Sequence, residues 1–213
     1  MKAAVFRAAA RKRKSKWRTA IFERNNMDLV YHASPAGGLK KIEPHVSTHG
    51  ENYVYAAKSR ALALIFSQKH DDYILHIGYD DETEELTLTE RVEGALEAVF
   101  RGKRGFLYAL DAENFESGRT PWAPELTSAF VEPVVNAEEI GDCLATLLSY
   151  EAQGELTVFR YPARPPYVPS DDSDLVEATA YFLKTAKDPH ALVERASKTH
   201  PRLAERFQAL LKG

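Results

Sequence analysis

The chain has 213 residues, of which 44% are hydrophobic and 28% are charged, and it contains one cysteine. Its length suits one domain with an additional segment, and its composition is that of a globular protein. No apolar run approaches the roughly 20 residues that cross a bilayer, and a single cysteine forms neither an internal disulfide nor a cysteine cluster for a metal. We therefore expect a cytoplasmic protein without a membrane span or a metal site, in which Cys143 packs in the core.

Charge is distributed unevenly along the chain. Residues 1–18 contain 8 basic residues and no acidic one, and the remaining residues contain 20 basic and 31 acidic ones, a net charge of −11. We expect residues 1–26 to be a basic extension and the domain to begin at Met27. The basic residues at positions 2–18 could bind nucleic acid or an acidic membrane, serve as a transit peptide, or have no role.

The first half of the chain predicts short strands and few helices. Strand-forming residues predict strands over 28–32, 53–56, 73–79, 86–91 and 106–110. Breakers predict a turn over Ser34–Gly38. Helices are expected over 60–70, where Ser59 can cap the first turn, and over 92–100.

The second half predicts a change from strands to helices. After a loop over 115–124, strands are expected over 125–135 and 156–161. Between them Asn136 and Glu139 form a capping box for a helix that ends at Gly154. Four prolines predict an extended tether over 162–169.

Residues 170–213 read as helices that pack on the domain. Asp174 and Glu177 are a possible capping box for the first helix, Asp188 precedes the second and His200 the third. Short strands with few helices predict an α+β fold over residues 27–161.

Several catalytic motifs are missing from the sequence. It contains no Gly-x-Gly-x-x-Gly, P-loop, His-Glu-x-x-His, Gly-x-Ser-x-Gly or Cys-x-x-Cys motif. This argues against Rossmann dehydrogenases, P-loop NTPases, zincins and common serine hydrolases.

One group of residues is suited to holding a nucleotide. His32 and Ser34 lie two residues apart at the end of a predicted strand, so both side chains can reach ribose hydroxyls on one side of the chain. Tyr55 on the next strand and Phe66 on the following helix can offer two aromatic walls to a heteroaromatic ring.

These residues resemble the motifs of a known family. Tyr31-His32-Ala33-Ser34 is similar to the first motif of the diphtheria toxin-like and poly(ADP-ribose) polymerase-like ADP-ribosyltransferases, roughly Tyr/Trp-His-Gly-Ser/Thr. Tyr55 and the two alanines after it resemble the second motif, and Phe66 follows Tyr55 by the 11 residues at which the family has another aromatic residue. The resemblance implies an ADP-ribosyltransferase-like split sheet, with NAD bound by His32, Ala33, Ser34, Tyr55 and Phe66.

The third motif of this family is a glutamate at the start of a later strand. Loss of nicotinamide develops positive charge on the ribose carbon, and a carboxylate near the 2′-hydroxyl stabilises that charge. Glu125 opens the predicted strand over 125–135 and is the candidate, with Glu132 as the runner-up. The resemblance thus implies Glu125, His32 and Tyr55 as catalytic residues.

The function that this resemblance implies is transfer of ADP-ribose from NAD to a protein, a nucleic acid or water. Two alternatives keep the fold: a non-catalytic module that binds a nucleotide or a nucleic-acid end, and an enzyme similar to the RNA 2′-phosphotransferases that use NAD. A structural or phage-type interaction protein is a further alternative.

Each candidate residue also has a purely structural interpretation. His32 can close its strand by bonding to backbone, and Ser34 is a common turn residue before proline. Tyr55 and Phe66 can be core residues, and Glu125 can be an ordinary surface carboxylate.

Overall fold

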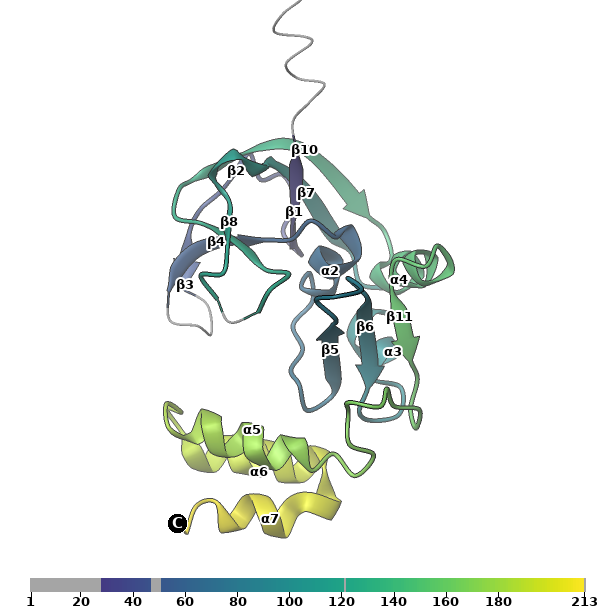
Figure 1. Cartoon of the computed structure of the whole chain (residues 1–213), viewed down its shortest axis with the longest axis vertical. Coiled ribbons are helices and arrows are strands. Elements are labelled where there is room, and N and C mark those ends of the chain that lie inside the picture. The colour runs from purple at the N-terminus through teal and green to yellow at the C-terminus, as the bar shows by residue number, and fades with distance from the viewer. Residues whose placement is uncertain (1–27, 47–50, 121, 213) are drawn as a thin grey trace, which may run out of the picture.

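The strands of this chain form three sheets in the part that the computed structural model describes, which is residues 28–46, 51–120 and 122–212 (Figure 1). Some helices lie between strands in the sequence and others follow the last strand, and the sheets are largely antiparallel, which agrees with the expected α+β class. The basic extension at residues 1–26 lies outside the described residues.

The first sheet has the strand order β1-β7-β10-β2 and is antiparallel throughout. Its strands are β1 (Leu29–Ser34), β7 (Gly105–Asp111), β10 (Glu132–Ile140) and β2 (Lys41–Ile42). The register of β10 shifts between Val134 and Asn136 where it pairs with β7, and such an irregularity bends a strand. The sheet accordingly curves into a half-barrel (Figure 1).

The second sheet carries the predicted aromatic strand, β4. Its order is β3-β4-β9-β8, again antiparallel, with β3 (His45–Val46), β4 (Asn52–Ala56), β9 (Leu126–Ser128) and β8 (Glu116–Ser117). Val54 and Ala56 of β4 face a buried cluster, which joins this sheet to the concave side of the half-barrel. The cluster consists of Val30, Ile42, Val54, Ala56, Tyr108 and Leu110.

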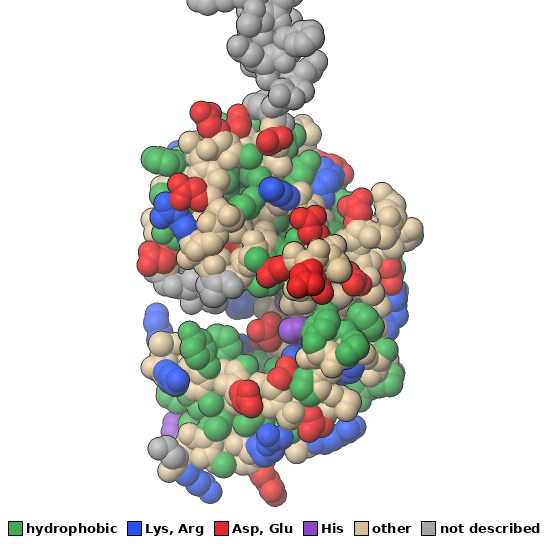
Figure 2. Space-filling view, viewed as in Figure 1, with side chains coloured by type: hydrophobic (Ala, Val, Ile, Leu, Met, Phe, Trp, Pro, Cys, Tyr) green, Lys and Arg blue, Asp and Glu red, His purple; other side chains and the backbone are tan. Residues whose placement is uncertain are grey.

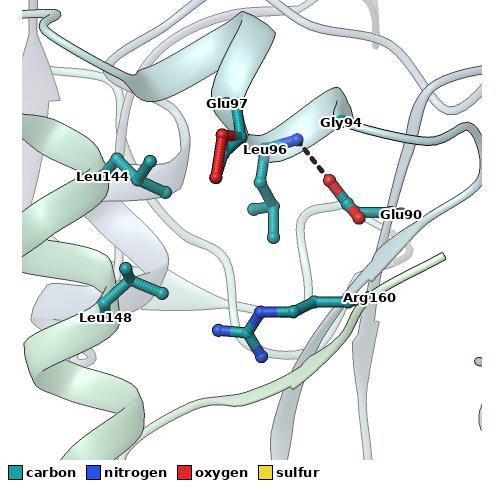
Figure 3. A pocket seen from close by; sticks show the side chains of 7 residues that line it. All are labelled: Glu90, Gly94, Leu96, Glu97, Leu144, Leu148 and Arg160. Atoms are coloured by element: carbon teal, nitrogen blue, oxygen red, sulfur yellow. Dashed lines mark hydrogen bonds between the residues drawn. The ribbon is translucent and has the colours of Figure 1, made fainter.

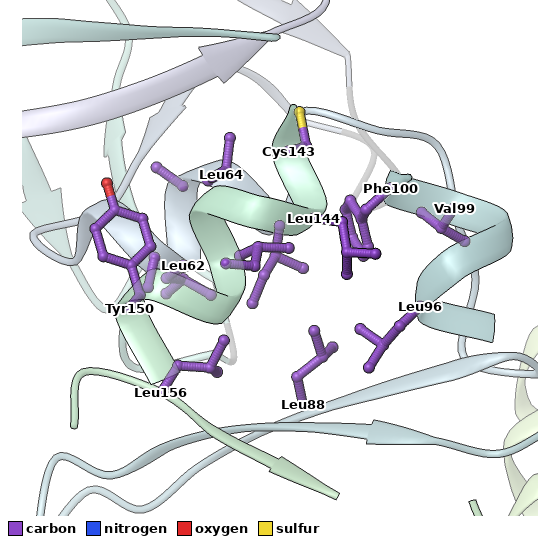
Figure 4. Packing of buried hydrophobic residues seen from close by; sticks show 14 of the residues in the cluster. Leu62, Leu64, Leu88, Leu96, Val99, Phe100, Cys143, Leu144, Tyr150 and Leu156 are labelled. Atoms are coloured by element: carbon purple, nitrogen blue, oxygen red, sulfur yellow. The ribbon is translucent and has the colours of Figure 1, made fainter. Parts of the chain in front are cut away.

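The third sheet supports the helices. It contains β5 (Leu75–Tyr79), β6 (Leu86–Glu90) and β11 (Thr157–Phe159), of which β11 runs parallel to β6. The main core lies between this sheet and three helices, α2 (Arg60–Ile65), α3 (Ala95–Phe100) and α4 (Cys143–Ala152) (Figure 4). The thiol of Cys143 is buried in it, as expected, 3.6 Å from the hydroxyl of Ser67.

Helix starts were predicted with mixed success. Ser59 caps α2 by accepting a hydrogen bond from the N–H of Leu62, as expected. The helix predicted from Asn136 is wrong, because residues 136–140 continue β10 and pair with β7. The helix instead begins after Asp142, whose carboxylate accepts the N–H of Ala145. Pairing with β7 overrides the helix propensity of Ala and Glu in this segment.

The prediction of one continuous strand over residues 125–135 is also wrong. It is two strands, β9 and β10, which belong to different sheets and are separated by a turn at residues 129–131. In that turn the hydroxyl of Ser128 accepts the N–H of Phe130.

The C-terminal segment is helical, with α5 (Asp174–Leu183), α6 (Pro189–Thr199), the 3₁₀ turn η3 (Pro201–Leu203) and α7 (Ala204–Ala209). Asp188 caps α6 as expected. The capping box of Asp174 and Glu177 is wrong, because Ser173 is the N-cap and Asp174 instead pairs with Arg91 at 2.6 Å.

Buried polar contacts attach these helices to the third sheet. The hydroxyls of Tyr73 and Thr179 are 2.8 Å apart, and Nε2 of His200 donates to the carbonyl of Tyr73 at 2.6 Å. Arg91, with 2% of its side chain exposed, pairs with Asp172 and Asp174. The surface is hollowed between these helices and the sheets above them (Figure 2).

The tether over residues 162–169 packs against the third sheet. The hydroxyl of Tyr167 lies 2.5 Å from that of Thr87, and Val168 is buried. Arg164 donates to the backbone carbonyls of Glu90 and Arg91. The tether therefore connects the helices to the sheets along a fixed path.

Candidate functional site

Among the described residues, a single backbone bridge links the first and second sheets, between β1 and the end of β4. Tyr31 of β1 and Ala57, just after β4, exchange two backbone hydrogen bonds of 2.7 and 2.9 Å. No other backbone pairing joins these two strands among the described residues. We call the region along this unpaired edge of β1, at His32, Ala33 and Ser34, the split.

The backbone of Ala33 is directed into this split. Residues of an antiparallel strand point their N–H and C=O groups alternately to one neighbour and the other. Tyr31 points these groups at Ala57, so Ala33, two residues further on, points its own to the same side. The methyl group of Ala33 packs against the main core. A methyl group in place of the family's glycine hydrogen therefore leaves the backbone groups open to a ligand.

His32 closes the split from the side of β1. Its Nδ1 lies 2.8 Å from the carbonyl oxygen of Tyr55, which can only accept, so Nδ1 carries the hydrogen. Burial lowers the pKa of His32 below 6.5, the hydrogen bond to Tyr55 opposes this, and nearby His45 lowers the pKa further. A neutral imidazole with hydrogen on Nδ1 leaves Nε2 as an acceptor, which suits a ribose hydroxyl.

Ser34 shapes the turn that follows β1. Its Oγ accepts the N–H of Ala36 at 3.1 Å. This is the structural role expected of a serine before proline. The hydroxyl hydrogen is still available as a donor, so this contact is compatible with the predicted contact to ribose.

Tyr55 and Phe66 lie outside the buried clusters. Tyr55 is partly exposed, and its ring lies edge-on to His45 at 5.6 Å and to Tyr53 at 6.2 Å. Phe66 forms the C-cap of α2 and is 50% exposed. The interpretation of both rings as core residues is therefore not supported.

Trp122 contacts two of the candidate residues, which the sequence did not reveal. Its ring packs edge-to-face on Phe66, with centroids 5.7 Å apart. Its carbonyl accepts the N–H of Glu125 at 3.1 Å, so one residue links an aromatic wall to the candidate carboxylate. The signal in the sequence was a tryptophan between Pro121 and Pro124, three residues before that carboxylate.

Glu125 immediately precedes β9, and β9 pairs with β4. In that pairing Thr127 lies opposite Tyr55, and Leu126 lies opposite Ala56. Continuing the register by one residue sets Glu125 opposite Ala57, the residue that bridges to β1. The order β1-β4-β9 thus brings the three predicted catalytic residues onto neighbouring chain segments.

The two candidate carboxylates differ in their surroundings. Glu125 is partly buried, with Oε2 out of contact with solvent, so it is not an ordinary surface carboxylate. Glu132 is 2% exposed and accepts hydrogen bonds from Ser128, at 2.5 Å, and Asn114, at 3.4 Å. Glu132 therefore fastens the turn between β9 and β10.

A cavity of about 300 Å³ lies away from the split, between α3, α4 and the end of β11 (Figure 3). Its lining residues are Glu90, Gly94, Leu96, Glu97, Leu144, Leu148 and Arg160. The carboxylate of Glu90 already accepts the N–H groups of Leu96 and Tyr161, and Arg160 pairs with Glu151. These groups are therefore engaged within the fold.

Comparisons with models of known families, with curated proteins and with solved structures gave no match to this chain. Within the described residues, no helix combines the length and the apolar character that a membrane crossing requires.

Proposed function

We propose that this protein is an NAD-dependent ADP-ribosyltransferase-like enzyme, with its site in the split between β1 and β4. The observation that carries the proposal is the arrangement at Ala33 and His32. Backbone N–H and C=O groups enter the split at Ala33, where a planar carboxamide such as that of nicotinamide can bind both. A neutral His32, fixed by the Tyr55 carbonyl, offers Nε2 to a ribose hydroxyl.

The residues around this point fit the remaining parts of NAD. Tyr55 lies on β4 and Phe66 caps the C-terminus of α2, and both are partly exposed aromatic residues of the kind that packs on a nicotinamide ring. When NAD is bound, it supplies a glycosidic bond whose cleavage leaves positive charge on the ribose carbon. The carboxylate of Glu125, partly withdrawn from water beside the end of β4, is suited to stabilising that charge.

The test is release of nicotinamide from NAD by the purified protein and by two variants, Glu125→Gln and His32→Ala. We expect Glu125→Gln to lower kcat about 100- to 1,000-fold, the usual effect of removing a group that stabilises developing charge. NAD binding should survive this change, since the side chain keeps its size. His32→Ala should weaken binding as well as turnover.

The matched control is Glu116→Gln, which neutralises an exposed carboxylate on β8, the strand next to β9. It should turn over NAD as the wild type does. Equal turnover in all four proteins would rule out the assignment. Calorimetric binding of NAD and ADP-ribose by a wild type that releases no nicotinamide would instead support the non-catalytic module.

A further inference from the structure

One side chain of β7 forms hydrogen bonds to both ends of the loop that follows β1. Tyr108 is fully buried, and its hydroxyl donates to the carbonyl of Ala36 at 2.6 Å. The same hydroxyl accepts the N–H of Leu39 at 3.4 Å. Both ends of the segment from Ala36 to Leu39 are thus attached to one atom.

A second ring of β7 supports the middle of this loop. Phe106 lies two residues before Tyr108, and their rings are roughly parallel with centroids 6.3 Å apart. The backbone at Gly37 rests on Phe106, because a Cβ atom there would lie 2.5 Å from the ring's Cζ. A side chain at this position would therefore require the loop or the ring of Phe106 to shift.

The loop that follows β1 exposes mainly backbone atoms to solvent. Pro35, Ala36, Gly37 and Gly38 are exposed and carry little or no side chain. No hydrogen bond between described residues uses the N–H of Gly37 or Gly38. Short segments of this kind let the phosphates of a ligand approach backbone N–H groups closely.

The backbone bridge limits how a long ligand can run along β1. The bridge between Tyr31 and Ala57 closes it on one side of Ala33. A ligand whose ring is held at Ala33 therefore continues past Ser34, toward the loop that Tyr108 holds.

We infer that Tyr108 is a positioning residue, which sets this loop so that its backbone receives the ADP half of NAD. The inference rests on the proposed function and adds a basis for selectivity. A ligand that consists of the nicotinamide ring alone does not reach the loop, whereas a dinucleotide reaches it and binds more tightly. The site is thereby selective for a dinucleotide over nicotinamide alone.

The experiment compares the wild type with Tyr108→Phe, which keeps the ring and removes the hydroxyl. Calorimetry with NAD and with nicotinamide is combined with KM and kcat for nicotinamide release. We expect the Kd and KM for NAD to rise about three- to tenfold, the effect of one net hydrogen bond. The Kd for nicotinamide and kcat should stay at wild-type values.

Tyr73→Phe is the matched control, because it removes an equally buried hydroxyl that bonds to Thr179, at the C-terminal helices. It should change none of these constants. Gly37→Ala crowds the loop against the ring of Phe106 and leaves the hydroxyl of Tyr108 in place. It should weaken the binding of NAD and leave the binding of nicotinamide at the wild-type value. This second variant keeps the inference testable if Tyr108→Phe folds poorly.

Two results would overturn the inference while leaving the proposed function intact: wild-type affinity for NAD in both loop variants, or an equal loss of affinity for NAD and nicotinamide. A wild type that binds neither ligand would overturn the proposed function and the inference together.

Discussion

The protonation state of His32 decides what this side chain can do in the split. With one hydrogen on Nδ1, directed at the carbonyl of Tyr55, the ring has an acceptor at Nε2. A second proton would convert Nε2 into a donor and place a charge in a partly buried position. Burial lowers the pKa of His32 for this reason, so the neutral form prevails at neutral pH.

This predicts a defined pH dependence of NAD binding. The Kd for NAD should be constant above pH 6.5, the ordinary histidine pKa from which burial lowers that of His32, and should rise as pH falls through the lowered value. The free energy of unfolding should fall in the same direction, because the unfolded chain takes up the proton first. Calorimetry between pH 5 and 8 measures the first effect.

His32→Asn is the matching variant, because an amide can hydrogen-bond without titrating. Its Kd for NAD should be higher than that of the wild type and should lose the dependence on pH. Tighter NAD binding by the wild type under acidic conditions would contradict the assigned hydrogen position and role of His32.

At the scale of elements, local signals were predictable and long-range pairing was not. The caps at Ser59 and Asp188 act within one helical turn, and the proximity of His32 and Tyr55 follows from two consecutive strands. Residues 136–140 have a helical composition but pair as a strand with β7, which lies about 30 residues earlier in the chain.

The same limit explains why the sequence named Glu125 without its position and did not single out Trp122. Glu125 and Trp122 approach the first motif only because β9 pairs with β4, across about 70 residues. The direction of the Ala33 backbone depends on which edge of β1 is paired with β7. A single sequence records neither pairing. It could therefore name Glu125 and Ala33 as candidates, but it could not show where they lie in the fold.

The cap at Asp142 gives a prediction for α4. Its carboxylate accepts the N–H of Ala145 through one oxygen and the N–H of Gly102 through the other. Asp142→Ala should lower the free energy of unfolding by about 1 kcal/mol, the usual effect of losing an N-cap, in urea titrations. Asp142→Asn should retain most of the stability, and a stable alanine variant would show that the cap contributes nothing.

At the scale of the whole molecule, the C-terminal helices depend on buried charge. Arg91, the residue after β6, pairs with Asp172 at 2.9 Å and with Asp174 at 2.6 Å, and Arg164 of the tether approaches Asp172 at 3.4 Å. His200 lies beside the same carboxylate. Removing one member leaves opposite charges buried without compensation.

Arg91→Met should therefore lower the free energy of unfolding by about 3 kcal/mol, as the loss of one partner from a buried ion pair does. Arg104→Met is the matched control, since Arg104 is 69% exposed and pairs with Glu139 at the surface. It should change stability little. Similar losses in the two variants, measured by chemical denaturation, would show that the buried network is not what attaches the helices.

Acidic side chains dominate the face near the turn between β5 and β6, where residues 80–85 carry five carboxylates (Figure 2). Such a surface repels a polyanion. This face is therefore an unfavourable place for a contact with nucleic acid.

The buried thiol of Cys143 provides an intrinsic probe for local opening of the main core. It is the only cysteine in the chain, and it lies in the main core at the start of α4, against Ser67. An alkylating reagent reaches it only during moments when α4 leaves the core. The rate of its modification therefore reports how often that core comes apart, without any label being introduced.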